Sequence, residues 1–305
     1  MIYNMKFKQI VVLDDINISD SSMSALKDYS DSKVKVFDAD PKDNNEIIER
    51  IGNADCILLS WRTPIDKKIL SKCTKLKFIC LCGTNSNCID LEECKKRNIV
   101  VSNIIDYGDE GVVEYIFFQL LNLVRGFGKY QWKDYPAELS GKTLGIIGLG
   151  AVGKLLANAA LGFKMTVLYN SKSRKPEWEK RGLIFVDKEE LLKRSDFISL
   201  QTPKNVKILN KDDFKIMKEK ILVNTTLGKA FDEENFKEWI KQPNNYAIMD
   251  ASTSKDFYDE FYNLERVVFS DFIAGRTKES IIRLSQKVLE NIEAFLSGKP
   301  INKIN

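Results

Sequence analysis

Short runs of apolar, β-branched residues alternate with polar, helix-like segments along most of this chain. The runs are QIVVLD, VKVFD, CILLS, KFICLC and IVVSN between residues 9 and 103, and TLGIIGLG, TVLYN, LIFV, FISLQ, ILVNTT and YAIMDA from residue 143 onward. Strands separated by helices favour parallel sheets, because a parallel pair needs a long crossover connection. The alternation therefore predicts an α/β fold with two Rossmann-like, doubly wound parallel-sheet domains.

Helix signals fill the segments between these runs. DNNEIIERIGN and DLEECKKRN each open at an Asp that can cap free backbone amides. Helices are also predicted over residues 151–161, 188–194 and 233–242, and a long apolar helix over 109–125 precedes a turn-rich stretch. Residues 277–296 place Ile281, Leu284, Val288, Ile292 and Phe295 at helical spacing. We expect this last helix to pack on the first domain.

The composition excludes several classes of protein. The 47 basic and 43 acidic residues of the 305 are interleaved, so the net charge of +4 forms no basic stripe for nucleic acid. The most apolar helical stretch, residues 112–124, is too short to span a bilayer, and the first residues show no export leader. We therefore expect a cytoplasmic protein without nucleic-acid or membrane partners. The six cysteines are interpreted as reduced thiols rather than metal ligands.

The strongest chemical signal is the glycine pattern in GKTLGIIGLGAVGKLLANAALGF. Gly148, Gly150 and Gly153 form G-x-G-x-x-G between an apolar strand and an apolar helix that begins with Ala151 and Val152. The first glycine permits the tight turn, the second lets the backbone approach a pyrophosphate, and the third allows close helix packing. Free amides at the helix N-terminus favour an anion there. The pattern predicts a nicotinamide dinucleotide site; the alternative is a merely tight turn.

The residues after the next strand bear on which dinucleotide is bound. NAD sites usually place an Asp or Glu at this strand end, where it binds the ribose 2′-hydroxyl. Here the chain has Asn170, followed by Ser171, Lys172, Ser173 and Arg174. A neutral and then cationic run suits a 2′-phosphate, so NADP(H) is slightly preferred over NAD(H). The alternative is an exposed basic loop.

In order and approximate spacing, the motifs of nearly the whole chain resemble the D-isomer-specific 2-hydroxyacid dehydrogenase family. The resemblance is carried in the first part by WRTPIDKKIL, LKFICLCGTNSNCIDLEECKKRNIVVSN and DYGDEGVVEY, and in the second by GKTLGIIGLGAVGK, SDFISLQTPKN, ILVNTTLGKAFDEENF, YAIMDA and FIAGRTKES. It implies a substrate domain at residues 1–104 plus 278–305, an NAD(P)-binding domain at 105–277, and a cleft between the two domains. The long helix after Glu110 resembles the family's dimerisation element, which implies a homodimer.

The same resemblance implies cofactor contacts outside the glycine turn. Asp250 matches the position that holds the nicotinamide carboxamide, Thr202 and Pro203 match a loop near the adenosine, and Thr226 belongs to the same set.

The catalytic positions depart from the family. The expected Arg, which binds the substrate carboxylate, is Leu227, and the expected His, which exchanges the proton, is Phe272. The chain contains no histidine, and the usual acid-proline pair a few residues after Asp250 is missing, with Asp256 or Glu260 as approximations of the acid. Arg62, Tyr107 and Lys255 are candidate replacements, as are Lys229 and Arg276.

Three functions remain open. The first is an NAD(P)-dependent oxidoreductase that moves hydride to or from a small carbonyl or hydroxy substrate, uncharged or atypical, without the usual Arg and His. The second is a catalytically silent NAD(P)-binding sensor or assembly protein. The third is ordinary 2-hydroxyacid activity through a displaced Arg.

Overall fold

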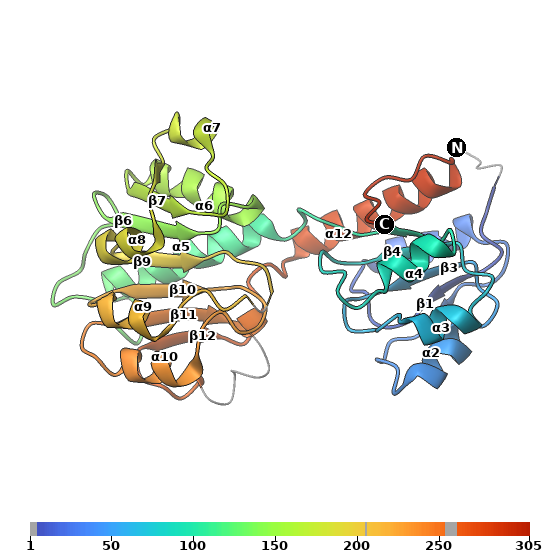
Figure 1. Cartoon of the computed structure of the whole chain (residues 1–305), viewed down its shortest axis with the longest axis horizontal. Helices are drawn as coiled ribbons and strands as arrows, with labels where there is room; N and C mark the ends of the chain where they lie inside the picture. Colours follow the sequence, from blue (N-terminus) through green and yellow to red (C-terminus); the bar gives the residue numbers. More distant parts are fainter. Residues whose placement is uncertain (1–4, 205, 254–260) are drawn as a thin grey trace. The chain divides into compact units, whose positions relative to one another are not determined.

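The strands and helices of this chain fold into two compact units. The computed structural model describes residues 5–204, 206–253 and 261–305. Unit 1 comprises Met1–Tyr107 with Lys278–Asn305, and unit 2 comprises Gly108–Thr277 (Figure 1). Each unit is built around its own parallel sheet, so the predicted α/β class with two parallel-sheet domains is confirmed.

Unit 1 contains a five-stranded parallel sheet with the strand order β2-β1-β3-β4-β5. The order changes direction between β1 and β3, because the chain adds β2 on one side of β1 and the later strands on the other. The strands are β1 (Ile10–Val12), β2 (Lys35–Val36), β3 (Cys56–Leu59), β4 (Phe78–Leu81) and β5 (Val100–Ser102).

Helices pack on both faces of this sheet. Successive side chains of a strand point to opposite faces, so Val11 joins one apolar cluster with helix α2, while Ile10 and Val12 join another with helix α12. Phe295 of α12 stacks on Phe78 of β4 at 4.5 Å between ring centroids. The expected packing of the last helix on the first domain is therefore confirmed. The helices are α1 (Asp20–Ala25), η1 (Leu26–Tyr29), α2 (Asn44–Ile51), α3 (Lys67–Lys72), α4 (Leu91–Lys96) and α12 (Lys278–Leu296).

Asp side chains begin two of these helices, as the sequence predicts. The Asp43 carboxylate accepts hydrogen bonds from the amides of Asn45 and Glu46 at the start of α2. The Asp90 carboxylate accepts one from the amide of Glu93 at the start of α4. These caps satisfy backbone donors that have no partner within a helix.

Unit 2 contains a seven-stranded parallel sheet in the order β12-β11-β10-β9-β6-β7-β8. Strand β12 was not predicted, because it is a short edge strand whose side chains are mostly half-buried and lack the continuous apolar pattern of the central strands. The strands are β6 (Thr143–Ile147), β7 (Thr166–Asn170), β8 (Ile184–Phe185), β9 (Phe197–Leu200), β10 (Ile221–Asn224), β11 (Tyr246–Asp250) and β12 (Val267–Ser270).

The helices of unit 2 also divide between two apolar clusters, one with α5 and α6 and the other with α8, α9 and α10. Helix α5 has the bounds that the sequence predicts, and it ends at Gly126 in the left-handed conformation with φ +68°. The predicted turn-rich stretch, residues 126–141, contains no helix or strand. The helices are α5 (Asp109–Arg125), α6 (Ala151–Gly162), α7 (Pro176–Glu179), α8 (Lys188–Arg194), α9 (Lys211–Ile216), α10 (Glu233–Ile240) and η2 (Ala251–Thr253).

Neither a membrane-spanning helix nor a cluster of potential metal ligands is found in the part of the chain that the structure describes. No helix there is both long enough and apolar enough to cross a bilayer. No group of three or more Cys, Asp or Glu side chains there is arranged to hold a metal ion. All six cysteines are thiols, and only Cys88 among them is more than marginally accessible.

We expect alkylation of the folded protein to modify the Cys88 thiol before the other five thiols. Burial raises the pKa of the Cys73 thiol to about 11 and that of Cys94 to about 12, so both lack thiolate as well as access. Iodoacetamide labelling at neutral pH, followed by peptide mass analysis, checks this order. Labelling in denaturant is the control and should modify all six thiols; native labelling of Cys73 or Cys94 at the Cys88 rate contradicts the fold of unit 1.

Candidate functional site

The predicted cofactor residues of unit 2 lie where its strands end. Gly148 follows β6, Asn170 ends β7, Thr202 follows β9, Thr226 follows β10, and Asp250 ends β11. The carboxyl ends of parallel strands meet at one edge of a sheet, so the structure brings these residues to a single edge. The strand order changes direction between β6 and β9. In open α/β sheets, ligands bind at the carboxyl edge beside such a change.

Two glycines of the motif are required by the packing of the protein itself. Gly148 has φ +102°, and a Cβ there would lie 2.1 Å from the carbonyl oxygen of Gln201. A Cβ on Gly153 would lie 2.3 Å from the carbonyl oxygen of Gly148. A larger residue at either position would push the helix or the neighbouring strand end away from the turn.

Gly150, by contrast, faces open space. A Cβ built on Gly150 meets no described atom within 4 Å, so packing within the protein does not explain this glycine. Gly150 is also the N-cap of α6, and no side chain of the described residues caps the helix. The first amides of α6, which include those of Ala151 and Val152, are therefore available to an anion such as a diphosphate.

A second observation at this edge fits a bound ligand. The hydroxyl oxygen of Thr202 is buried and has no hydrogen-bond partner among the described residues. A buried hydroxyl without a partner is unfavourable, so such groups usually bind water or a ligand. The neighbouring Pro203 is exposed. The open space at Gly150 and the unpartnered hydroxyl both fit a nucleotide lying across the ends of β6 and β9.

The loop after β7 is anchored beside the glycine turn. The carbonyl of Asn170 accepts a hydrogen bond of 2.8 Å from the Gly148 amide, and its side-chain amide donates to the Val186 carbonyl. The Ser171 hydroxyl donates to the Ser173 carbonyl. Lys172 is exposed, whereas the Arg174 guanidinium binds the Glu179 carboxylate. That pairing lowers the pKa of Glu179.

The loop after β10 positions Leu227. The buried side-chain oxygen of Asn224 accepts hydrogen bonds from the Thr226 amide at 3.3 Å and the Thr226 hydroxyl at 2.7 Å. These two hydrogen bonds hold Thr226 at the strand end, and the chain then turns at Gly228, which has φ +77°. Leu227 is half-buried and is not among the described side chains that form or pack against the apolar clusters.

Asp250 connects the end of β11 to the loop after β12. One carboxylate oxygen accepts a hydrogen bond of 2.5 Å from the Ser252 hydroxyl, and the other accepts one of 2.6 Å from the Ala274 amide. Burial raises the pKa of Asp250, although these hydrogen bonds oppose the rise. The loop that Asp250 holds carries Phe272, whose side chain is 78% exposed.

Sequence reasoning missed two residues around Asp250. The Tyr115 hydroxyl donates a hydrogen bond of 2.6 Å to the Met249 carbonyl, and burial together with the charge of Asp250 raises the pKa of Tyr115. Ser252 follows Asp250 by two residues, a spacing at which a hydroxyl often bonds a preceding carboxylate, so it was within reach of sequence analysis. Tyr115 lies in a distant helix and gave no such signal.

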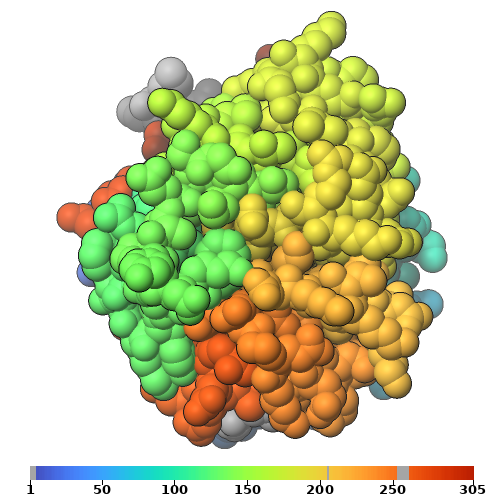
Figure 2. All heavy atoms as spheres, turned by 90° about the vertical axis from the view of Figure 1, so that its left-hand side faces the viewer, coloured from blue at the N-terminus to red at the C-terminus, as the bar shows by residue number. Residues whose placement is uncertain are grey.

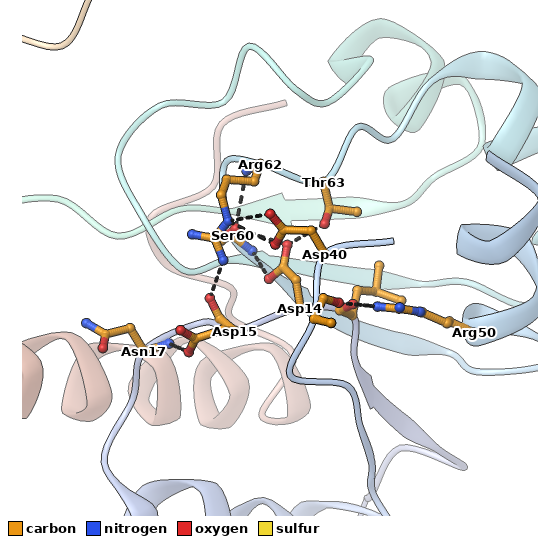
Figure 3. Close-up of polar contacts among 10 residues, drawn as sticks. Asp14, Asp15, Asn17, Asp40, Arg50, Ser60, Arg62 and Thr63 are labelled. Carbon is orange, nitrogen blue, oxygen red and sulfur yellow. Dashed lines mark hydrogen bonds and ion pairs between the residues drawn. The ribbon is translucent and has the colours of Figure 1, made fainter. Parts of the chain in front are cut away.

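Arg62 lies in a loop of unit 1 that polar contacts hold in place (Figure 3). Its Nε donates to the Asp40 carboxylate at 3.0 Å, and its Nη2 donates to the Asp15 carbonyl at 2.9 Å. Buried Asp14, which sequence analysis did not single out, accepts hydrogen bonds from the Ser60 amide and the Thr63 hydroxyl on either side. The Arg62 side chain therefore has a defined position.

The other candidate residues have different surroundings. Tyr107 is half-buried, and its hydroxyl lies 4.0 Å from the Cβ position of Gly83, after β4. Lys229 pairs with Glu233, and Arg276 is exposed. Lys255 lies outside the described residues, as do Asp256 and Glu260.

A cavity of about 390 Å³ lies elsewhere in unit 2, between α5, the loop after it and strand β12. It is lined by polar and aromatic side chains that include Gln119, Lys129 and Tyr262, and by none of the predicted site residues that the structure describes. In Figure 2, the green surface of the α5 region meets the orange-red surface of the β12 region. The cavity is thus separate from the strand ends that carry the glycine turn.

Known proteins resemble this chain over nearly its whole length. The family model for the D-isomer specific 2-hydroxyacid dehydrogenase catalytic domain matches residues 10–305. The glyoxylate reductase of Thermococcus litoralis is 32% identical over 288 residues, which cover 85% of this chain and 86% of the relative. The hydroxypyruvate reductase of Blautia hydrogenotrophica is 28% identical over 286 residues, which cover 86% of this chain and 88% of the relative.

A solved structure gives the same result for the fold. The acyclic imino acid reductase Bsp5, in complex with NADPH and D-Arg, matches with a TM-score of 0.83 and 28% identity, covering 97% of this chain and 100% of that one. The model match and the curated relatives show that this chain belongs to the D-isomer specific 2-hydroxyacid dehydrogenase family of NAD(P)-dependent oxidoreductases.

Proposed function

We propose that this protein is an NAD(P)-dependent oxidoreductase that transfers hydride to or from a small substrate without the family's usual Arg and His. The observation that carries the proposal is a contrast within unit 2. The glycine turn has the open space and uncapped helix that a diphosphate needs, whereas Leu227 and Phe272 stand at the positions of the ionic residues. The proposal includes a small-molecule substrate and a cytoplasmic location.

The cofactor would be held by the residues at the carboxyl edge of the unit 2 sheet. The amides of Ala151 and Val152 would bind the diphosphate, Thr202 and Pro203 would border the adenosine, and Asp250 with Thr226 would border the nicotinamide. The nicotinamide, when bound, accepts or supplies the hydride. NADP(H) is favoured because Lys172 and Arg174 follow β7 where an NAD site would have an acid, and the similar Bsp5 structure contains NADPH.

Proton handling must differ from that of a histidine-dependent enzyme. We propose that Tyr107 or Lys255 donates the proton to a carbonyl substrate and that Arg62 orients that substrate, since each side chain can donate a hydrogen bond or a proton. The half-buried position of Tyr107 and the hydrogen bonds that hold the Arg62 guanidinium support these roles.

Imine reduction is a second candidate activity. A protonated imine already carries its proton on nitrogen, so reduction of its carbon needs no general acid at the reacting atom. The absence of a histidine to act as general acid should therefore slow imine reduction less than carbonyl reduction. The similarity to the imino acid reductase Bsp5 also favours it.

The substrate class can be tested by following nicotinamide absorbance with NADPH or NADH. We expect turnover of uncharged aldehydes and ketones or of imines, with glyoxylate and pyruvate slower by about 10²-fold or more because the general acid is missing. Cofactor binding is measured in parallel by fluorescence. Efficient turnover of glyoxylate or pyruvate would show that a displaced Arg has restored the ordinary activity. Tight cofactor binding without turnover of any substrate would instead favour the silent sensor.

A substitution at Gly150 tests the cofactor site. Gly150→Val should fold normally, since its Cβ meets no described atom, yet it should abolish NADPH and NADH binding by filling the proposed diphosphate space. Gly162→Val, at the other end of α6, also meets no described atom and is the matched control. Circular dichroism checks folding, and fluorescence titration measures affinity. Unchanged affinity in folded Gly150→Val would refute the assignment.

The homodimer is a further part of the proposal, with α5 at its interface. Phe118 of α5 is 59% exposed, and Phe127 and Tyr135 in the following stretch are 76% and 83% exposed, so unit 2 presents large apolar side chains here.

Phe118→Asp should convert the dimer to monomer. Light scattering should give twice the chain mass of 34.9 kDa for the native protein and about that mass for the variant. Ile184→Asp, which alters a 42% exposed apolar residue on the far edge strand β8, should stay dimeric. A monomeric native protein, or a dimeric Phe118→Asp variant, would contradict the proposed interface.

A further inference from the structure

The loop after β7 borders the proposed diphosphate site. Strand β7 pairs with β6 so that Asn170 lies opposite Ile147, directly before the glycine turn. In a Rossmann domain the adenosine ribose lies at the end of the second strand, which is β7 here. The side chains of residues 171–175 would therefore meet the ribose 2′ position of a dinucleotide bound in this way.

The guanidinium of Arg174, one of the cations of this loop, is held in a defined orientation. Its Nε lies 2.8 and 3.0 Å from the two Glu179 carboxylate oxygens, and its Nη2 lies 2.7 Å from one of them. The guanidinium thus uses its Nε side and leaves Nη1 without a hydrogen-bond partner among the described residues. A guanidinium can bind a second anion through its Nη1 end, because its five N–H groups point in fixed directions.

Glu179 is itself fixed by Tyr169. The Tyr169 hydroxyl donates a hydrogen bond of 2.8 Å to Glu179 and accepts one of 2.7 Å from the Lys175 amide. Tyr169 is fully buried in β7, and its ring packs edge-on against Phe185. Arg174 lies over the same Phe185 ring, 5.6 Å from its centroid. A chain of contacts therefore runs from the sheet through Glu179 to Arg174.

This arrangement matters for affinity because arginine side chains are flexible. An arginine that is already ordered loses less side-chain freedom on binding a phosphate than one that must be ordered by the ligand. The Arg174 side chain is 65% exposed, so it would otherwise move in solvent, whereas the Glu179 side chain is 21% exposed.

We propose that Tyr169 and Glu179 are positioning residues for cofactor specificity, which hold Arg174 so that its Nη1 end binds the 2′-phosphate of NADP(H). The proposal rests on the nucleotide-binding function proposed above. In the opposite role, Glu179 would repel the 2′-phosphate and accept a hydrogen bond from the 2′-hydroxyl of NAD(H). The two roles predict opposite changes in affinity.

The test is a set of variants whose dissociation constants for NADPH and NADH are measured by nicotinamide fluorescence. Arg174→Ala should weaken NADPH binding by about tenfold or more, since a charge-assisted hydrogen bond is lost, and leave NADH binding unchanged. Tyr169→Phe and Glu179→Ala should each weaken NADPH binding severalfold without affecting NADH. Tyr169→Phe should have no further effect in the Arg174→Ala background, because it acts through Arg174.

The matched control is Arg181→Ala, which removes one nearby positive charge. Arg181 binds the Asn158 side chain and lies over the Trp178 ring, and it should change NADPH affinity much less than Arg174→Ala. Stronger NADPH binding by Glu179→Ala, equal weakening of both cofactors by Tyr169→Phe, or additive effects of Tyr169→Phe and Arg174→Ala would overturn the positioning role. Failure of the native protein to bind either cofactor would instead refute the proposed function, and this proposal with it.

Discussion

The close approach of the glycine turn to its neighbouring strand end is the contact on which the unit 2 site depends. Gly148 comes so near the Gln201 carbonyl that a Cβ would overlap it, and Gly153 comes equally near Gly148. These two contacts bring the start of α6 to the ends of β6 and β9. The open space at Gly150 and the buried Thr202 hydroxyl follow from that geometry.

Two further loops at the same sheet edge are held by hydrogen bonds rather than by close packing. Asp250 binds both Ser252 and the Ala274 amide, so one buried carboxylate sets the loop that carries Phe272. Asn224 similarly sets the loop that carries Leu227. Hydrogen bonds to buried side chains thus fix both loops, although Leu227 is only half-buried and Phe272 is exposed.

Unit 1 shows how polar contacts replace close packing at a strand end. Asp14 lies where the strand order changes direction, and it binds Ser60 and Thr63 on either side of the Arg62 segment. Asp40 and the Asp15 carbonyl then hold the guanidinium. A surface ion pair alone contributes little stability, so the defined position of Arg62 depends mainly on the buried carboxylate beneath its loop.

The sequence by itself determined the two parallel sheets, the bounds of α5 and the glycine turn, because these follow from local apolar patterns, caps and backbone freedom. It did not reveal β12, whose half-buried edge position weakens the apolar pattern. Nor did it indicate that Tyr169 and Glu179 hold Arg174, that Asp14 supports the Arg62 loop, or that Tyr115 contacts the end of β11. Each of these contacts joins residues from different elements of the fold. Only the tertiary structure decides them, since they depend on which strand ends and loops the packed sheets place side by side.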